Sequence, residues 1–402
     1  MGSRVFKIER SNPKANLYVM MLSGAIWTPI STAMGIYWQI YLMMLGASPL
    51  EIAMIAMSSM LVLSVARILG GYLADIIGRR KLIVSMTYLV SLCYLAMFFA
   101  STWKIILLVS IFLNLFLLYQ PATEAIIADS TSDNARGKNY GVLNLVPSIL
   151  ILFSPIIAYL FISRHGVIGG TRILILLTAM AGFVVGILRT LTLRETIKTQ
   201  RINKAKSRRF LSQYNDALRI INQKMFALFI FVMLLGVVGG LMVMTQLYVI
   251  TYLGVSYDLW AMLRFVYLLT FALFVVPAGI ATDKYGRKNM LIISTILLLL
   301  STTFLVCASI KPLETLLFAY VIVGSISWAI MSCSIPSLEA DVLPKEVRGK
   351  AYAVIATANS ITQAIFQLIC GYIYEAYGET IPQILALFFI IIMLIVALKV
   401  KT

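Results

Sequence analysis

The sequence predicts an all-α polytopic membrane protein with twelve transmembrane helices in two pseudo-symmetric six-helix bundles. Three observations carry this prediction: the composition, a succession of long apolar segments, and a repeat that relates the two halves of the chain. Apolar residues make up 61% of the 402 residues and charged residues only 12%, whereas soluble domains carry about 25% charged residues. The chain therefore has too few charges to cover a surface that faces water.

Long apolar segments separated by charged or turn residues predict the spans, because a helix needs about 20 apolar residues to cross a bilayer. Several segments are longer than this, which fits tilted helices or helices that protrude into water. We number the spans 1 to 12 along the chain. They are predicted at residues 17–45, 50–74, 82–100, 104–128, 139–162, 171–191, 225–253, 259–282, 289–309, 313–340, 350–374 and 380–399.

The basic residues predict the orientation of the spans, since cytoplasmic loops of membrane proteins collect Lys and Arg. If the N-terminus lies inside, 27 of the 33 basic residues fall in segments on that side and only four in loops on the other. We therefore expect a multi-pass protein of the cell membrane with both termini in the cytoplasm. This distribution accounts for most of the net charge of +17, and anionic lipids at the cytoplasmic face are the expected counter-charge.

The longest segment that is not apolar divides the chain into residues 1–191, a linker at 192–224, and residues 225–402. The linker contains a basic cluster, followed by aromatic and aliphatic residues at helical spacing between Phe210 and Ile221. This pattern predicts a cytoplasmic linker with an amphipathic helix on the membrane surface, and a solvated connector without a partner is the alternative. We expect no nucleic-acid partner, because the composition is that of a membrane protein.

A repeat relates the two halves at a nearly constant distance along the chain. Because its three matches follow the same order in both halves, we infer that a unit of six spans was duplicated. Two units with an even number of spans run in the same direction across the membrane, and a substrate site is expected between them near the midplane. The matches are 45–48 with 253–256 and 71–80 with 279–288, both at an offset of 208, and 128–140 with 340–352 at an offset of 212.

The repeated loop carries a specific motif. After span 2 the chain reads G-x-L-A-D-x-x-G-R-R from Gly71 to Arg80, a related copy follows span 8, and R-G follows spans 4 and 10. In these features the whole chain resembles the major facilitator superfamily. The resemblance implies two six-helix domains that rock around a central cavity and expose it to each side in turn, and it implies no particular substrate.

The resemblance also implies a latch between helices that favours the outward-open state. Asp75 lies near the C-terminal end of its helix, where the helix dipole disfavours an anion, so it needs a partner such as Arg79, Arg136 or the start of span 11. We expect Asp75→Asn to favour the inward-open state. Ile76 stands where the family usually has a basic residue, while the second copy keeps Lys284. The latch residues carried over are Gly71, Asp75, Gly78, Arg79, Arg80 and Arg136 in the first half and Asp283, Gly286, Arg287 and Arg348 in the second.

Polar and aromatic side chains inside the spans are candidates for a substrate cavity, because polar groups are costly in hydrocarbon and should face the protein interior or water. Span 11 places Asn359, Gln363 and Gln367 on one helical face. The alternative is that such side chains only form hydrogen bonds between packed helices. The candidate cavity residues are Trp27, Thr28, Thr32, Asn114, Gln120, Gln246, Trp328, Asn359, Gln363 and Gln367.

Glu124 is the candidate for proton coupling. It lies in span 4, five positions before Asp129 at the edge of the membrane. A partly buried carboxyl group in such a place is suited to binding and releasing a proton. The alternative is a structural pairing of Glu124 with Arg67 or Arg136.

Two arginines within the spans are further candidates for coupling or charge relay. Arg67 lies two helical turns before Asp75, and it is placed to pair with Asp75 or Glu124 or to bind an anion. Arg264 lies in the outer part of span 8. Arg264 either forms an ion pair with Asp258 or forms a gate that attracts anions.

Catalytic, cofactor and metal sites are not expected. The chain has one histidine, His165, and its four cysteines lie in apolar spans without C-x-x-C spacing, which leaves little for acid–base or metal chemistry. It also lacks a glycine-rich phosphate loop with its lysine, so transport driven by ATP is disfavoured.

The predicted function is secondary active transport of a small organic solute across the cell membrane by alternating access, with proton-coupled export or exchange. A facilitator or symporter for sugars or organic anions is the alternative. A receptor that transports nothing, or a lipid scramblase on the same scaffold, is the hypothesis from another class. The polar but nearly uncharged cavity favours a neutral, amphipathic or weakly charged solute, and we expect a monomer.

Overall fold

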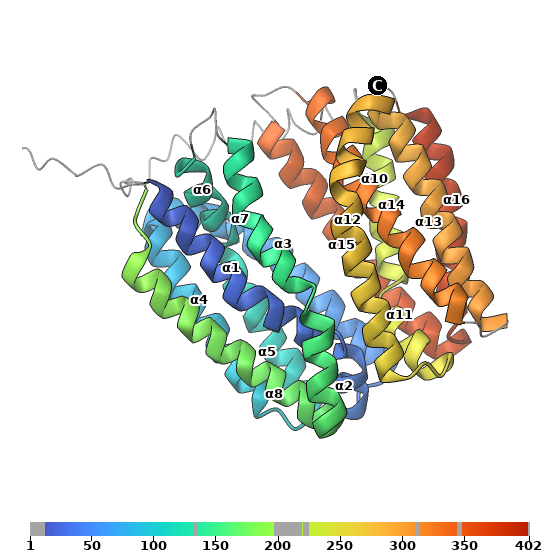
Figure 1. Ribbon diagram of the computed structural model, residues 1–402, viewed down its shortest axis with the longest axis horizontal. Coiled ribbons are helices and arrows are strands. Elements are labelled where there is room, and N and C mark those ends of the chain that lie inside the picture. Colours follow the sequence, from blue (N-terminus) through green and yellow to red (C-terminus); the bar gives the residue numbers. More distant parts are fainter. Residues whose placement is uncertain are drawn as a thin grey trace, which may run out of the picture.

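The computed structural model describes residues 13–131, 136–196, 225–310, 314–343 and 348–400, together with Arg219 alone in the linker. Within these residues every regular element is helical (Figure 1). A helix is the expected spanning element, because it satisfies its own backbone N–H and C=O groups where no water is present. The all-α fold class predicted from the sequence is confirmed.

Among the described residues, the first half of the chain forms eight helices and one short 3₁₀ turn. They are α1 (Pro13–Gly35), α2 (Trp38–Met44), α3 (Pro49–Ile77), α4 (Arg79–Phe98), α5 (Trp103–Phe116), η1 (Leu117–Tyr119), α6 (Gln120–Asp129), α7 (Arg136–Ile151) and α8 (Ser154–Thr192).

The described part of the second half contains six long helices, with a broken segment after the first of them. Its elements are α10 (Phe226–Leu241), α11 (Thr245–Leu247), the π-helical turn η3 (Tyr248–Tyr252), α12 (Tyr257–Tyr285), α13 (Arg287–Ile310), α14 (Glu314–Val342), α15 (Arg348–Tyr377) and α16 (Ile381–Lys399).

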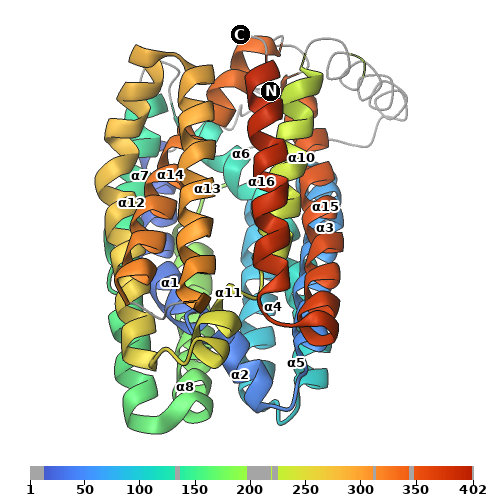
Figure 2. The same ribbon diagram turned by 90° about the vertical axis from the view of Figure 1, so that its right-hand side faces the viewer.

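The described residues contain ten helices long and apolar enough to cross a membrane, or eleven if α10 and the bent segment after it count as one span. One of these helices turns back on itself at Gly166, whose φ of 67° is not helical. A Cβ atom on Gly170 would lie 2.7 Å from the Phe161 carbonyl oxygen, although nine residues of straight helix would separate the two by about 13 Å. The first arm of α8 therefore continues α7 along predicted span 5 and the second arm matches predicted span 6, so the arrangement is consistent with twelve spans (Figure 2).

Helices α1 to α8 lie on one side of the molecule and α10 to α16 on the other (Figure 1). The start of α1 and the end of α16 lie at one face, which we call the terminus face. Helices α2 and α11 lie toward the opposite face, which we call the far face (Figures 1 and 2).

Close packing in the first half depends on two glycines of α8. A Cβ atom on Gly182 would lie 2.2 Å from both the Trp27 ring and the Ser91 hydroxyl, and one on Gly186 would lie 2.7 Å from the Tyr88 ring. Small residues four positions apart let membrane helices approach closely. Gly182 and Gly186 therefore let α1 and α4 pack directly against α8.

The predicted linker helix lies almost entirely outside the described residues. Of residues 192–224, the structure describes 192–196 and Arg219. The domain boundaries at this linker stay a prediction.

Candidate functional site

Two glutamines join the halves at the far face, where predicted spans 1 and 7 are both broken. The side-chain amide of Gln39 donates to the Val243 carbonyl and accepts from Leu247 N–H (3.2 Å). In return, the amide of Gln246 accepts from Gln39 N–H (3.2 Å) and donates to the Ile36 carbonyl (2.6 Å). We call Gln39 and Gln246 the glutamine pair.

The glutamine pair replaces backbone hydrogen bonds that the two breaks remove. In an uninterrupted helix, Leu247 N–H would donate to the Val243 carbonyl, and the amide of Gln39 stands between them instead. A carboxamide suits this place because it carries both a donor and an acceptor. Since Gln246 is only 8% exposed, its loss would leave the N–H of Gln39 unpaired, and the loss of Gln39 would leave the Val243 carbonyl and Leu247 N–H unpaired. Each such group costs about 1–3 kcal/mol.

Aromatic side chains extend the same contact between the halves. Trp260 Nε1 donates to the Ile36 carbonyl (2.9 Å), and the Tyr37 hydroxyl donates to the Tyr257 carbonyl (2.6 Å). The rings of Tyr37 and Tyr257 meet edge to face at 5.8 Å. Burial of these rings adds apolar contact to the hydrogen bonds.

Helices α3 and α15 approach each other at the same face. Leu50 N–H donates to a carboxylate oxygen of Glu375 (3.1 Å). A Cβ atom on Gly371 would lie 2.4 Å from that of Ala53 and 3.0 Å from the Pro49 carbonyl oxygen. The far face therefore holds a continuous contact between the two halves.

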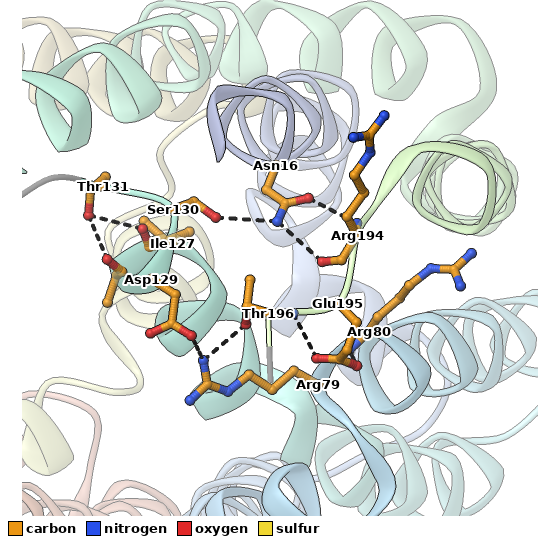
Figure 3. Close-up of polar contacts among 11 residues, drawn as sticks. Asn16, Arg79, Arg80, Ile127, Asp129, Ser130, Thr131, Arg194, Glu195 and Thr196 are labelled. Carbon is orange, nitrogen blue, oxygen red and sulfur yellow. Dashed lines mark hydrogen bonds and ion pairs between the residues drawn. The ribbon is translucent and has the colours of Figure 1, made fainter. Parts of the chain in front are cut away.

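At the terminus face, the ion pairs recorded among the described residues lie within one half or the other. Arg79 pairs with Asp129 in the first half, and Arg287 pairs with Asp341 in the second. The two pairs are related by the sequence repeat. Arg79 also donates to the Thr196 hydroxyl (3.2 Å), which fixes the segment after α8 beside this ion pair (Figure 3).

Further contacts attach the segment after α8 to the first half. Arg80 N–H donates to a Glu195 carboxylate oxygen (2.9 Å), and the Arg80 guanidinium donates to the Thr190 carbonyl (2.7 Å). Asn16, at the start of α1, accepts from Arg194 N–H (2.9 Å) and donates to the Ser130 hydroxyl (3.3 Å) (Figure 3).

The structure places the other predicted latch residues as follows. Gly78 and Gly286 occupy the turns after α3 and α12 with φ values of 97° and 88°, which only glycine adopts readily. Gly71 and Asp283 are exposed. The side chains of Asp75, Arg136 and Arg348 lie outside the described residues, so the predicted partners of Asp75 stay a prediction.

The predicted span 11 stripe lies against α10. The Asn359 amide donates to the Val232 carbonyl (2.6 Å). The Gln363 amide nitrogen lies 3.3 Å from where a Cβ atom of Gly239 would stand. Gln367 is 6% exposed, and its buried Oε1 has no hydrogen-bond partner in the described part of the chain.

The remaining predicted cavity residues come from α1, α5, α6 and α14. Trp27 packs against α8, Thr28 and Thr32 are half-buried on α1, and Trp328 is 46% exposed on α14. Asn114 donates to the Ser110 carbonyl (2.8 Å) on α5.

The predicted coupling residues do not form the expected ion pairs within the described residues. Arg67 Nε donates to Gln120 Oε1 (3.1 Å), and Glu124 is exposed with no recorded partner. Arg264 lies over the rings of Trp260 and Tyr267, at 5.9 and 5.4 Å from their centroids. No pairing of Arg264 with an acid is recorded there, and a cation held by two rings retains the capacity to attract an anion.

Two buried or half-buried ionisable residues were not among the sequence candidates. Arg189 lies at the end of predicted span 6 and was counted only among the basic residues of the cytoplasmic side. It is 8% exposed near the end of α8 and donates to the hydroxyls of Ser23 (3.3 Å) and Thr87 (2.7 Å). Its guanidinium also lies over the Tyr119 ring at 5.6 Å. Glu339 is half-buried in α14. Its position within a predicted span was the signal that could have identified it.

A cavity of about 260 Å³ lies beside the glutamine pair, inside the first half. It is bordered by residues of α1 to α5 and is partly open, and no charged side chain lines it. Its lining residues are Met34, Trp38, Gln39, Leu42, Ile52, Ile55, Ala56, Ser59, Tyr94, Met97, Ser110, Leu113 and Asn114.

Comparison with known proteins agrees with this architecture. A sequence model described as the Major Facilitator Superfamily matches residues 17–263 and 225–401, which together span nearly the whole chain. The chain belongs to the Major Facilitator Superfamily. The resemblance noted from the loop motifs is thereby confirmed.

Similar proteins of this superfamily are transporters. An uncharacterized MFS-type transporter of Methanocaldococcus jannaschii is 25% identical over 393 residues, covering 94% of this chain and 97% of the relative. A crystal structure of the nucleoside transporter NupG matches with a TM-score of 0.76 at 16% identity, covering 96% of this chain and 99% of that one. A POT family transporter in complex with 5-aminolevulinic acid matches with a TM-score of 0.77 at 14% identity, covering 97% and 96%. At these identities the solved structures establish the fold alone.

Proposed function

We propose that this member of the Major Facilitator Superfamily is a secondary transporter that moves a small organic solute by alternating access. The observation that carries the proposal is that the two faces of the protein differ in the contacts recorded between its halves. Hydrogen bonds cross between the halves at the far face through the glutamine pair, whereas the ion pairs recorded at the terminus face lie within each half. A site that is closed on one side and free to open on the other is what alternating access requires.

We propose further that both termini are cytoplasmic and that the membrane is the cell membrane. The uneven distribution of basic residues supports this orientation. The far face is then external, and the structure corresponds to an inward-facing state. The glutamine pair would close the external side.

Counterflow in proteoliposomes tests the transporter proposal. Purified protein is reconstituted, loaded with one unlabelled solute at a time from a panel of nucleosides, sugars, amino acids and organic acids, and given a trace of the same labelled solute outside. A transporter accumulates the label transiently, while empty liposomes do not. If no solute of the panel exchanges although the protein binds one of them, a receptor replaces the transporter.

Proton coupling through Glu124 is the finer proposal. Glu124 is an exposed carboxyl in a span, and no pairing with Arg67 is recorded among the described residues. Uptake driven by an imposed pH gradient should be lost in Glu124→Gln while counterflow remains. Full retention of gradient-driven uptake would contradict the proposal. Glu314→Gln, which makes the same change at an exposed carboxyl at the start of α14, is the control.

Organic-anion transport is the second candidate, and Arg264 is the observation that favours it. This arginine is half-buried beneath Trp260 at the contact between the halves, and no acid pairs with it in the described residues. Arg264→Gln should then abolish exchange of organic acids and leave that of neutral solutes. Equal exchange of acids by wild type and Arg264→Gln would remove this candidate.

A further inference from the structure

The cavity beside the glutamine pair has an uncharged lining that includes polar groups able to form hydrogen bonds. Asn114 uses its Nδ2 to bond Ser110, which leaves its Oδ1 as an acceptor. The hydroxyls of Tyr94 and Ser59 take part in no hydrogen bond recorded for the described residues. Polar groups inside a membrane protein are costly unless they find a partner. The Asn114 Oδ1 and the two hydroxyls can therefore form hydrogen bonds with a polar group of a ligand.

The rest of the lining favours a flat ring. Trp38 and Tyr94 contribute aromatic side chains, and Met34 and Met97 contribute thioethers. Such side chains pack well against aromatic and heteroaromatic rings. An ionised ligand is disfavoured, because no lining residue carries the opposite charge and burial of an unpaired ion is expensive.

One wall of the cavity is held by a chain of contacts that begins at a glycine. The absence of a side chain on Gly182 makes room for the Trp27 ring. Trp27 in turn meets the Tyr94 ring edge to face at 5.5 Å. Trp27, which the sequence suggested as a substrate contact, therefore positions Tyr94 instead of lining the cavity.

The second half carries different side chains at the equivalent positions. At the repeat offset of 208, Ala56 and Ser59 of α3 correspond to Arg264 and Tyr267 of α12. Arg264 and Tyr267 pack against each other at 5.4 Å. Two small residues thus border a cavity in the first half where the repeat places two large ones in the second.

We propose that this cavity binds a neutral solute that carries a flat ring and a hydrogen-bonding amide or hydroxyl group. The ring packs against the side chains of Trp38 and Tyr94, and Asn114 forms a hydrogen bond with the polar group. That this ligand is the transported solute rests on the proposed transporter function, whereas its binding does not.

Three neutral ring solutes test the binding: nicotinamide, uracil and indole. Nicotinate and 1-methylnicotinamide are the charged comparators, because they match nicotinamide in shape and carry a negative or a positive charge. Binding to the purified full-length protein is measured by equilibrium dialysis and by the shift in thermal unfolding, since a ligand of the native state raises apparent stability. We expect at least one neutral solute to bind, and nicotinamide to bind at least tenfold more tightly than its charged analogues if it is that solute.

Two variants locate the binding. Ala56→Phe fills the cavity and Asn114→Leu removes the amide, and each should weaken binding at least tenfold. Ala96→Phe adds the same ring to an exposed position of α4 and should leave binding unchanged. If Ala56→Phe is not monodisperse, Asn114→Leu alone decides. Binding by none of the neutral solutes, or binding that Asn114→Leu retains in full, overturns the proposal.

Counterflow separates this inference from the transporter proposal. If a neutral ring solute binds in the cavity but no solute exchanges, the inferred binding site is supported and the proposed transporter function is contradicted. If another solute exchanges while no ring solute binds, the transporter function stands and the cavity inference fails.

Discussion

The two halves carry the same ion pair at the terminus face, but in different surroundings. Arg79 and Arg287 are repeat equivalents, and each pairs with the aspartate near the end of a neighbouring helix, Asp129 or Asp341. The Arg79 side chain is 14% exposed and the Arg287 side chain 34%. The duplication therefore kept the charges, whereas the degree of burial depends on what packs against each copy.

The segment after α8 accounts for part of this difference. Thr196 accepts a hydrogen bond from Arg79 (3.2 Å), and Glu195 accepts one from Arg80 N–H (2.9 Å). Arg287 has instead a longer hydrogen bond to the Ser337 carbonyl (3.4 Å) within its own half. The first ion pair thus also anchors the beginning of the linker.

The largest expected effect concerns the glutamine pair, to which each half contributes one side chain. Gln39→Leu should leave the Val243 carbonyl and Leu247 N–H unpaired, which costs roughly 2–6 kcal/mol at about 1–3 kcal/mol for each group. Gln246→Leu should leave Gln39 N–H unpaired, while the Ile36 carbonyl keeps its hydrogen bond from Trp260, so the expected cost is about 1–3 kcal/mol. Both variants should therefore shift the protein away from the arrangement joined at the far face. Double electron–electron resonance between spin labels at Met54 and Tyr377, in a background without other cysteines, should report longer distances.

Gln120→Leu is the control, because Gln120 bonds Arg67 within the first half. An effect of Gln39→Leu without an effect of Gln246→Leu would show that the two halves do not contribute alike. Unchanged distances in both variants would contradict the role of the glutamine pair.

The next effect should be confined to the first half. Gly182→Ala places a methyl group 2.2 Å from Trp27 and Ser91, and overpacking of this kind costs about 1–3 kcal/mol. The thermal unfolding midpoint should fall, and binding of neutral ring solutes should weaken because Trp27 displaces Tyr94. Gly35→Ala is the matched control, since nothing lies within 4 Å of its added Cβ. Equal midpoints for the two variants would refute the packing argument.

A smaller effect distinguishes the two ion pairs. Arg79→Gln should lower stability by about 1–3 kcal/mol, because it removes a largely buried charge-assisted bond and leaves Asp129 unpaired. Arg287→Gln should cost about 0–1 kcal/mol, as expected for a pair that solvent screens. Thermal unfolding of both variants, with Asp129→Asn and Asp341→Asn to complete two double-mutant cycles, gives the two coupling energies. A larger coupling for the second pair would reverse the comparison.

The smallest effect isolates the contribution of the linker. Thr196→Val keeps the shape of the side chain and removes the hydrogen bond to Arg79, so it should cost about 0.5–1.5 kcal/mol. In the background of Arg79→Gln, the same substitution should have no further effect. If Thr196→Val costs as much in that background as in wild type, its bond to Arg79 contributes nothing.

The span pattern could be predicted because each span is determined locally by hydropathy. The turn between spans 5 and 6 was placed correctly around Gly166, even though helical backbone continues close on both sides of it. The partners in the two ion pairs were harder to predict from the sequence. The sequence marked Arg79, Asp129, Arg287 and Asp341 through the repeat, but it did not assign Arg79 to Asp129, because the two residues are 50 positions apart and other charges were candidates.

The candidate site was only partly accessible from the sequence. Gln246 was identified as a polar residue in a span, yet its role in joining the halves depends on Ile36 and Gln39, more than 200 positions away. Arg189 was counted with the cytoplasmic basic residues because the apolar run ends near it, whereas the helix continues to Thr192 and Arg189 is buried. Helical periodicity places a side chain on a face, but it does not identify the helix that packs there.

The sequence by itself determined the class of the protein, its spans, its duplication and its family, because hydropathy and motif spacing are properties of the chain read in one dimension. Only the tertiary structure decided which polar groups meet. It set the glutamine pair across the two broken spans, placed Arg67 in a hydrogen bond with Gln120, and left a cavity beside Ala56 where the second half carries Arg264. These outcomes depend on how helices distant in sequence approach one another, since hydrogen bonds and packing act only over a few ångströms.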